Sequence, residues 1–226
     1  MDALRHKMYI TFIEDDHYLF FLSGLCTTLL LTFASFLLGT AFGIALCAAL
    51  RSKRPAVQKF AGFIQKFFME FPTMVLLMVL IYVVFGHSSL PVLLIVILGL
   101  TLKAGAYLSE VFSSALDTIS SGETEAARTL GMTRWQAFRY VVLPQTVKAA
   151  LPLYENQFTD TLEETSIVGY LAVVDLTRAS EIVSSRTMDA FIGLFTIAVL
   201  YFVIGAVVRR LIRRLLTPSR KGGEAA

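Results

Sequence analysis

Apolar residues run along this chain in long blocks, with short polar segments between them. A helix that crosses a lipid bilayer needs roughly 20 mostly apolar residues. Five blocks reach this length, and the fourth has polar interruptions: 19–50, 57–85, 90–112, 149–174 and 190–208. The pattern therefore predicts an all-α membrane protein with about five transmembrane helices.

The first predicted span carries small residues on one face. Ser35, Gly39 and Gly43 are spaced four residues apart, which places them on one side of a helix. Lipid chains are as apolar as leucine, so helices in a bilayer associate through close packing, which small residues permit. We expect another helix to approach the first span along this stripe. A contact with another copy of the chain is the alternative interpretation.

Basic residues gather after the first, third and fifth predicted spans. They are Arg51, Lys53 and Arg54, then Arg128, Arg134, Arg139 and Lys148, and finally Arg209, Arg210, Arg213 and Arg214. Because cytoplasmic loops carry an excess of Lys and Arg, this distribution predicts an N-terminus outside and a C-terminus in the cytoplasm. The predicted parts are an extracytoplasmic lead (1–18), a transmembrane domain (19–216) that includes a cytoplasmic loop (117–144), and a cytoplasmic polar tail (217–226).

Composition excludes an ordinary soluble domain. The chain is 56% hydrophobic and 16% charged, with a mean hydropathy of +0.68, whereas soluble domains carry about 25% charged residues. The apolar blocks are too many and too long for a cleaved signal peptide, so we expect none to be removed. The net charge of +3 comes from basic residues beside apolar blocks, which fits a lipid bilayer and not nucleic acid.

An intramembrane enzyme is the alternative from a different functional class. A metalloprotease of this kind needs two histidines at helical spacing beside an acid, but His6, His17 and His87 are scattered. A serine protease needs a turn of the Gly-x-Ser-x-Gly type or a Ser and a His on facing helices, and the segment "GHSSLP" offers only a turn between spans. We therefore expect no catalytic residue and no metal site. A purely structural membrane protein is a further alternative.

The loop 117–144 is polar and has the local signals of two short helices. Ser120 or Ser121 can cap the first helix, and Glu125 suits its positive N-terminal end. Gly131 can supply the left-handed residue that ends this helix, and Thr133 can cap a second one. Trp135, Phe138 and Val141 or Val142 would share one face of that second helix. These signals predict a helical hairpin in water, and a solvated loop without further function is the alternative.

The hairpin sequence "EAARTLGMTRWQAFRYVVLP" resembles the EAA loop of ABC-transporter permease subunits. The matching positions are Glu125, Ala126, Ala127, Gly131, Val141, Leu143 and Pro144. The surrounding chain resembles the polar amino acid permeases, at Gly105, Ala106, Tyr107, Glu110, Gly122 and Glu123 before and within the loop, and at Pro152, Asn156, Thr165, Ser166, Leu176 and Thr177 after it. The resemblance covers most of the chain and implies the type I ABC importer (MetI-like) permease fold.

The resemblance also implies a function and partners. The chain would be a bacterial cytoplasmic (inner) membrane permease that imports polar amino acids, or another small solute, and would bind no cofactor itself. ATP and Mg²⁺ would be bound by a dimer of cytoplasmic ABC ATPase subunits, which receives residues 121–143 as a coupling helix. A second permease subunit, identical or paralogous, and an extracytoplasmic solute-binding protein would complete the complex. Pro144 is expected to interrupt the backbone hydrogen bonding between the hairpin and the fourth span.

The chain departs from the family pattern in three places. Residues 69–72 read Met-Glu-Phe-Pro where the family usually has Arg-Gly-Thr-Pro. Ser113 replaces a usual arginine, and Glu163 and Glu164 replace a Lys-Asp pair. The fold and the coupling to an ATPase do not depend on these residues, but the identity of the amino acid carried does.

Ionisable and polar residues inside the predicted spans are candidates for the substrate pathway, because a polar or charged side chain in a bilayer is costly and usually has a task. The candidates are Lys103, Tyr107, Glu110, Asn156, Asp160, Glu163, Glu164, Thr165 and Ser166. In one hypothesis Lys103 attracts the carboxylate of an amino acid, and Asp160 or Glu164 attracts its ammonium group. In the other, Lys103 pairs structurally with Glu70, Glu110 or Asp160, or the acids lie in water at the outer end of the span.

The segment 175–189 between the last two predicted spans carries Arg178, Glu181 and Arg186. By its resemblance to the family it is a candidate docking site for a binding protein at the outer gate. The alternative is a charged loop that is simply solvated.

Overall fold

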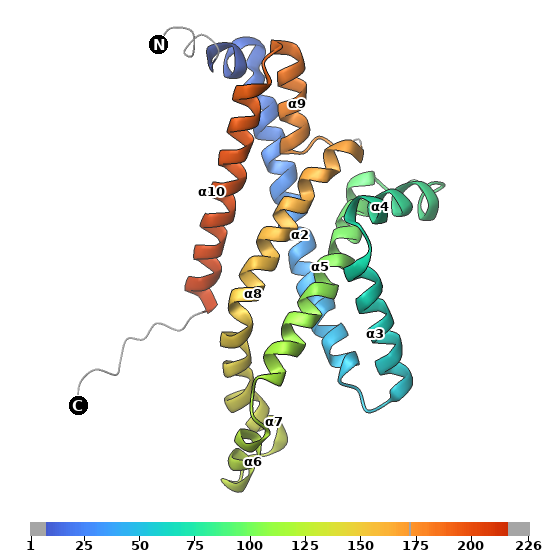
Figure 1. Cartoon of the computed structure of the whole chain (residues 1–226), viewed down its shortest axis with the longest axis vertical. Helices are drawn as coiled ribbons and strands as arrows, with labels where there is room; N and C mark the ends of the chain where they lie inside the picture. Colours follow the sequence, from blue (N-terminus) through green and yellow to red (C-terminus); the bar gives the residue numbers. More distant parts are fainter. Residues whose placement is uncertain (1–7, 172, 217–226) are drawn as a thin grey trace, which may run out of the picture.

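In the computed structural model, which describes residues 8–171 and 173–216, every regular element is a helix (Figure 1). The elements are η1 (Glu14–Asp16), α2 (His17–Leu50), α3 (Pro55–Glu70), α4 (Thr73–Met78), η2 (Val79–Val84), α5 (Val92–Asp117), α6 (Ser121–Thr129), α7 (Arg134–Ala137), η3 (Phe138–Val142), α8 (Leu143–Glu164), η4 (Thr165–Leu171), α9 (Leu176–Thr187) and α10 (Ala190–Leu216). The all-α prediction is confirmed. Residues 1–7 of the predicted lead and the predicted tail 217–226 lie outside the described residues.

Three of the predicted spans appear as single long helices. Among the described residues, α2, α5 and α10 are long and apolar enough to cross a membrane. The C-terminal ends of α2 and α5 point toward the end of the molecule that carries α6 and α7, and α10 runs in the same direction (Figure 1). The three basic groups found in the sequence therefore face the same way along the bundle.

The second predicted span is not one straight helix. It consists of α3 followed by α4 and η2, with a bend of 108° between the two parts. Pro72 disfavours helical backbone in the residue before it, and Phe71 is accordingly extended, with φ −74° and ψ 129°. The prediction of a continuous helix over 57–85 is therefore wrong at Phe71 and Pro72.

The fourth predicted span, 149–174, is also displaced. Its helix, α8, starts at Leu143, and from Thr165 the chain continues as a 3-10 helix, η4. The α-helical hydrogen bonding is interrupted before Pro144, as expected. The interruption is a π-helical turn and not a break in the helix, because the Leu143 N–H donates to the Phe138 carbonyl five residues earlier. A proline in the first turn of a helix needs no N–H partner. The chain from α7 through η3 to α8 is therefore continuously helical, and the hairpin is joined directly to this span.

The small-residue stripe of α2 packs against α5 of the same chain, as predicted. The Ser35 hydroxyl donates to the Ile97 carbonyl at 3.3 Å. A Cβ atom built on Gly43 would lie 2.9 Å from the Gly105 carbonyl oxygen, and one built on Gly105 would lie 2.9 Å from that of Gly39. The two backbones are thus in direct contact, and no side chain fits between them at these positions.

This packing predicts a specific loss of stability. Gly43→Ala places a methyl group against backbone that cannot move aside, so we expect a cost of about 1–3 kcal/mol from overpacking. Gly62→Ala is the matched control, because its Cβ would meet only the Leu50 side chain at 3.8 Å. Thermal unfolding in detergent should show a lower midpoint for Gly43→Ala and an unchanged or higher one for Gly62→Ala. Equal midpoints for the two variants would contradict close helix contact at Gly43.

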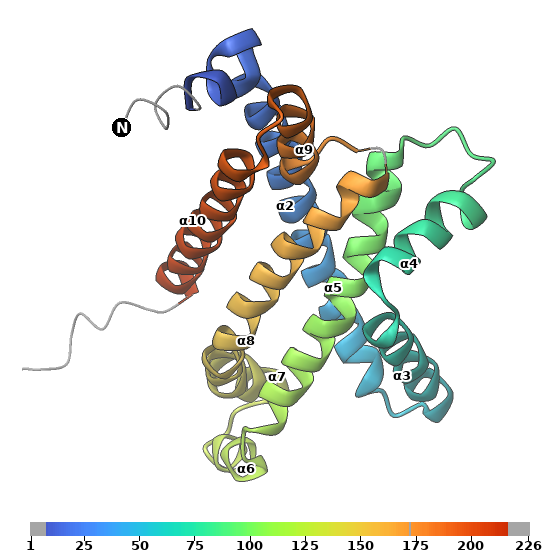
Figure 2. The same ribbon diagram turned by 45° about the horizontal axis from the view of Figure 1, so that its top comes forward.

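The segment after η4 is a packed helix and not a solvated loop. α9 packs against both α2 and α10 near the end of the molecule where α2 begins (Figure 2), and it buries Leu176, Ala179 and Val183. The buried Asp175 carboxylate caps it by accepting the N–H groups of Thr177 and Arg178. The interpretation of 175–189 as a merely solvated loop is therefore wrong, because the apolar positions of this segment recur at helical spacing and find partners on both sides.

Candidate functional site

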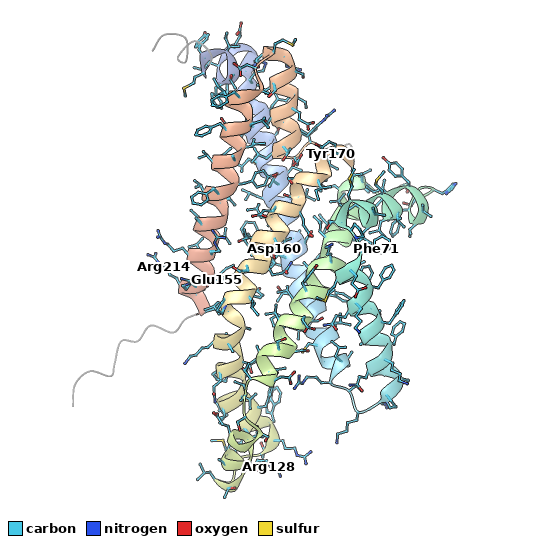
Figure 3. The ribbon with its side chains drawn as sticks, in the orientation of Figure 1. Phe71, Arg128, Glu155, Asp160, Tyr170 and Arg214 are labelled. Atoms are coloured by element: carbon cyan, nitrogen blue, oxygen red, sulfur yellow. The ribbon has the colours of Figure 1, made fainter. Side chains whose placement is uncertain are left out.

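The hairpin formed by α6, α7 and η3 lies at the end of the molecule farthest from α9 and the start of α2 (Figures 1 and 2). Figure 3 labels Arg128 at this end. The tip therefore projects from the bundle, where another protein can reach it.

Local capping builds the hairpin as the sequence predicted. The Ser120 hydroxyl accepts the Gly122 N–H at 3.3 Å. The Thr133 hydroxyl accepts the Gln136 N–H at 3.2 Å, while the Gln136 side chain accepts the Thr133 N–H at 2.8 Å, which completes a capping box. Each helix therefore begins with satisfied backbone donors.

Gly131 ends the first helix of the hairpin in the left-handed conformation, with φ +88°. Its N–H donates to the Arg128 carbonyl at 3.0 Å, and the Met132 N–H donates to the Ala127 carbonyl at 3.2 Å. These two bonds form a Schellman motif. The predicted role of Gly131 as a helix terminator is confirmed.

The hairpin buries its alanines and exposes large apolar side chains. Ala127 and Ala137 are buried, whereas Leu130, Trp135 and Tyr140 are 82%, 69% and 68% exposed. The Trp135 ring stacks on Phe138 at a centroid distance of 5.8 Å, so the predicted shared face is present. The other positions that match the EAA pattern lie around this surface: Glu125, Ala126 and Pro144 are exposed, and Val141 and Leu143 are half-buried. An exposed apolar surface rimmed by polar residues is typical of a protein contact site.

The hairpin is also held to the bundle. A hydrogen bond from the Gln145 amide to Glu123 joins α6 to the first turn of α8. Close by, an Arg51 guanidinium nitrogen lies 2.7 Å from Asp117 and links the ends of α2 and α5. That hydrogen bond raises the pKa of the Arg51 guanidinium. Displacement of the hairpin would therefore move α8 with it.

The second candidate site is the group of charges inside the spans. Lys103 is 6% exposed, and its Nζ donates to the Phe71 carbonyl at 2.8 Å. The same nitrogen lies 3.7 Å from Glu164 Oε1, which accepts the Thr73 hydroxyl at 2.8 Å. Tyr107 donates to the Met69 carbonyl at 3.1 Å. The structure thus brings Lys103, Tyr107 and Glu164 together at the break between α3 and α4, where Figure 3 labels Phe71.

Glu164 was not among the structural partners considered for Lys103 in the sequence, which were Glu70, Glu110 and Asp160. Glu110 is exposed and accepts the Gln65 amide at 3.0 Å. Asn156, Asp160 and Glu163 are exposed on α8, where Figure 3 labels Asp160. The remaining candidates belong to η4: Thr165 is buried and donates to the Leu162 carbonyl at 2.6 Å, and Ser166 is half-buried. Lys103, Tyr107 and Glu164 therefore form a bonded group at the break, whereas Asn156, Asp160 and Glu163 form an exposed polar group on α8 and Glu110 lies apart from both.

A second buried carboxylate was missed by the sequence analysis. Glu155 of α8 is buried, and Arg213 of α10 binds it through two nitrogens, at 2.7 and 3.2 Å. One turn away, Arg209 donates to Thr159 at 3.1 Å. Residues four apart lie on one face of a helix. The equal spacing of Glu155 and Thr159 on one segment and of Arg209 and Arg213 on another is therefore the sequence signal for this contact, with two acceptors facing two donors. Within the described residues no group of three or more His, Cys, Asp or Glu is placed to hold a metal ion.

Comparison with known proteins agrees with this geometry. The family described as binding-protein-dependent transport system inner membrane component matches residues 39–222. The probable amino-acid permease protein YxeN of Bacillus subtilis is 30% identical over 187 residues, which cover 81% of this chain and 84% of that protein. The histidine/lysine/arginine/ornithine transport system permease protein HisM of Salmonella typhimurium is 35% identical over 118 residues, which cover 52% of this chain and 50% of that protein.

Solved structures show the same fold. A crystal structure of an amino acid ABC transporter with histidines superimposes with a TM-score of 0.78 at 30% identity, covering 87% of this chain and 92% of that one. The methionine ABC transporter MetNI in an inward-facing conformation gives a TM-score of 0.72 at 21% identity, and the match covers 91% of this chain and 100% of that one. At this identity the match supports the fold alone. The chain therefore belongs to the family of binding-protein-dependent transport system inner membrane components, the permease subunits of ABC importers, and is a transport subunit and not an enzyme.

Proposed function

We propose that this permease carries polar amino acids into the cell and is driven through the hairpin by a separate ATPase. The observation that carries the coupling role is the hairpin itself. Both of its helices begin with a side-chain cap, the first helix ends at Gly131, and the second continues into α8. The amino acid substrate is supported by the names of the relatives, two of which are amino acid permeases.

The proposed complex places one partner on the hairpin and another on the exposed face of α9. A dimer of ABC ATPase subunits binds ATP and Mg²⁺ and receives the hairpin, with Glu125 available for a basic residue and Trp135 and Leu130 for an apolar groove. A second permease subunit, identical or paralogous, completes the pathway, and a solute-binding protein delivers the amino acid at the opposite face. The exposed face of α9, where Arg178 pairs with Glu181 at 2.8 Å, is the proposed contact for that protein.

The proposed topology places the hairpin in the cytoplasm, residues 1–18 outside and the C-terminus inside the cell. Two observations support it. Basic residues follow α2, α5 and most of α10, and those three helices run in the same direction toward the hairpin end (Figure 1).

The proposed substrate pathway follows the exposed polar face of α8. Asn156, Asp160 and Glu163 would be costly against lipid, so this face meets water or another protein. Asp160 and Glu163 can attract the ammonium group of an amino acid. Lys103 is already bound to the Phe71 carbonyl beside Glu164, which leaves it poorly placed to bind a solute carboxylate.

Reconstitution tests this function. The permease, co-expressed with its ATPase and binding protein, should purify as a complex, and in proteoliposomes its ATP hydrolysis should rise with particular polar amino acids. A panel of amino acids, sugars and inorganic anions identifies the substrate. Stimulation by a compound of another class, and by none of the amino acids, would reject the proposed substrate and retain the transporter. Failure to retain an ATPase during purification would reject the coupling role.

A further inference from the structure

Two helices hold the break in the second span through polar side chains that are buried or half-buried. From α5, Lys103 donates to the Phe71 carbonyl at 2.8 Å and Tyr107 donates to the Met69 carbonyl at 3.1 Å. From the last residue of α8, Glu164 accepts the Thr73 hydroxyl at 2.8 Å. These bonds attach to the two sides of Pro72, where the helix axis turns by 108°. We call this group, with Lys103 facing Glu164, the charged joint.

The helix that ends in the charged joint begins in the hairpin. From Arg134 to Glu164 the chain passes through α7, η3 and α8 without a non-helical residue. A helix transmits displacement along its axis because its turns are hydrogen-bonded to one another, and Pro152 inside α8 removes one of these bonds without ending the helix. Movement of the hairpin therefore reaches Glu164 directly, without crossing a loop.

Among the described residues, the charged joint leaves one carboxylate oxygen of Glu164 without a hydrogen bond. The distance of 3.7 Å between Lys103 Nζ and Glu164 Oε1 is beyond a hydrogen bond. The other carboxylate oxygen, Glu164 Oε2, is buried and has no hydrogen-bond partner within the part of the chain that the structure describes. A buried carboxylate oxygen without a partner is costly. A shift of α8 that brought this oxygen to the Lys103 ammonium group would give it a partner and would strain the bond between Thr73 and Oε1.

We propose that the charged joint couples α8 to α4, so that movement of the hairpin changes the bend between α3 and α4 and thereby opens or closes the pathway. Thr73, Tyr107 and Lys103 are then positioning residues, which act on transport through the second span and not by touching the solute. This inference rests on the proposed coupling of the hairpin to an ATPase. It differs from the hypothesis that Lys103 and Glu164 bind the amino acid.

The two interpretations predict different kinetic changes. A residue that touches the solute alters the KM for transport, whereas a residue that positions the second span alters how many ATP molecules are hydrolysed for each amino acid carried. Both quantities can be measured on the same proteoliposomes, which contain the permease, the ATPase and the binding protein.

Thr73 offers a matched pair of variants. Thr73→Val keeps the shape of the side chain and removes the donor to Glu164, while Thr73→Ser keeps the donor. Because a hydrogen bond to a charged group contributes enough to shift an equilibrium about tenfold, Thr73→Val should raise the ATP hydrolysed per amino acid carried by about that factor. The KM for the amino acid should stay within about twofold of the wild type. Thr73→Ser should behave as the wild type does.

Tyr107→Phe provides the second measurement if Thr73→Val does not fold. It removes the hydrogen bond to the Met69 carbonyl and keeps the ring, and it should also raise ATP use per solute without a change in KM. An increased KM with unchanged ATP use in either variant would assign these residues to solute binding and overturn the joint. ATP use in both variants equal to that of the wild type would overturn it as well. Absence of amino acid-stimulated hydrolysis in the wild-type complex would instead reject the proposed function.

Discussion

Gly131→Val is expected to reduce transport by more than about tenfold while leaving the amount of permease in the membrane unchanged. The backbone at this position has φ +88°, a conformation that costs an ordinary residue roughly 1–2 kcal/mol and a β-branched one more. Apart from Gly131 itself and the two adjacent residues, no described residue has an atom within 4 Å of a Cβ built there, so the loss would come from the backbone and not from a clash with another part of the chain. The Schellman bonds would open and the hairpin would lose its shape.

Gly131→Asn is the matched control for this result. Asparagine adopts the left-handed conformation more readily than other residues that carry a side chain, so this variant should retain most of the transport activity. Uptake of the solute into proteoliposomes and the yield of the ATPase in co-purification are the two measurements. Wild-type activity in Gly131→Val would contradict the role of the hairpin. Equal losses in both variants would show that a side chain at 131 collides with the partner, and would reject the explanation from backbone strain.

Lys103→Met is expected to destabilise the folded permease severely. The substitution leaves the Glu164 carboxylate partly buried without its cation, and removing one member of a buried pair costs about 3–5 kcal/mol. Adding Glu164→Gln removes the remaining charge and keeps an acceptor for Thr73. The double variant should therefore recover most of the stability that Lys103→Met loses.

Thermal unfolding in detergent and the amount of membrane-inserted protein measure this recovery. A double variant that is no more stable than Lys103→Met would contradict the pairing of Lys103 with Glu164. The KM for transport by the double variant then tests whether Lys103 and Glu164 touch the solute. Since its fold is restored, an unchanged KM would exclude a direct contact between the two charges and the solute.

Local sequence signals were sufficient for the hairpin. The caps at Ser120 and Thr133 and the termination at Gly131 each depend on residues within five positions along the chain, so no distant contact is needed to create them. The same holds for the lengths of α2, α5 and α10, which follow from continuous apolar runs. The bend at Pro72 was also readable in principle, because the signal lies in the proline itself. It was missed because apolar residues continue on both sides of it.

Contacts between distant segments could not be predicted in the same way. Lys103 was recognised as a buried charge, but three other acids were considered as its structural partner, and the Glu164 that faces it is 61 positions away. The pairing of Glu155 with Arg213 was missed for the same reason. A single sequence shows that a charge needs a partner in a bilayer, yet the choice among several acids depends on how the helices are rotated and bent.

The sequence by itself therefore determined the helical class, the three long apolar helices α2, α5 and α10, the hairpin with its caps and the resemblance to ABC permeases, because each rests on neighbouring residues or on a pattern along the chain. Only the tertiary structure decided that the stripe of Ser35, Gly39 and Gly43 faces α5, that α9 packs against α2 and α10, and that the hairpin continues into a helix ending at the charged joint. These features depend on side chains that meet across the bundle, where the packing of whole helices selects which of the possible partners come into contact.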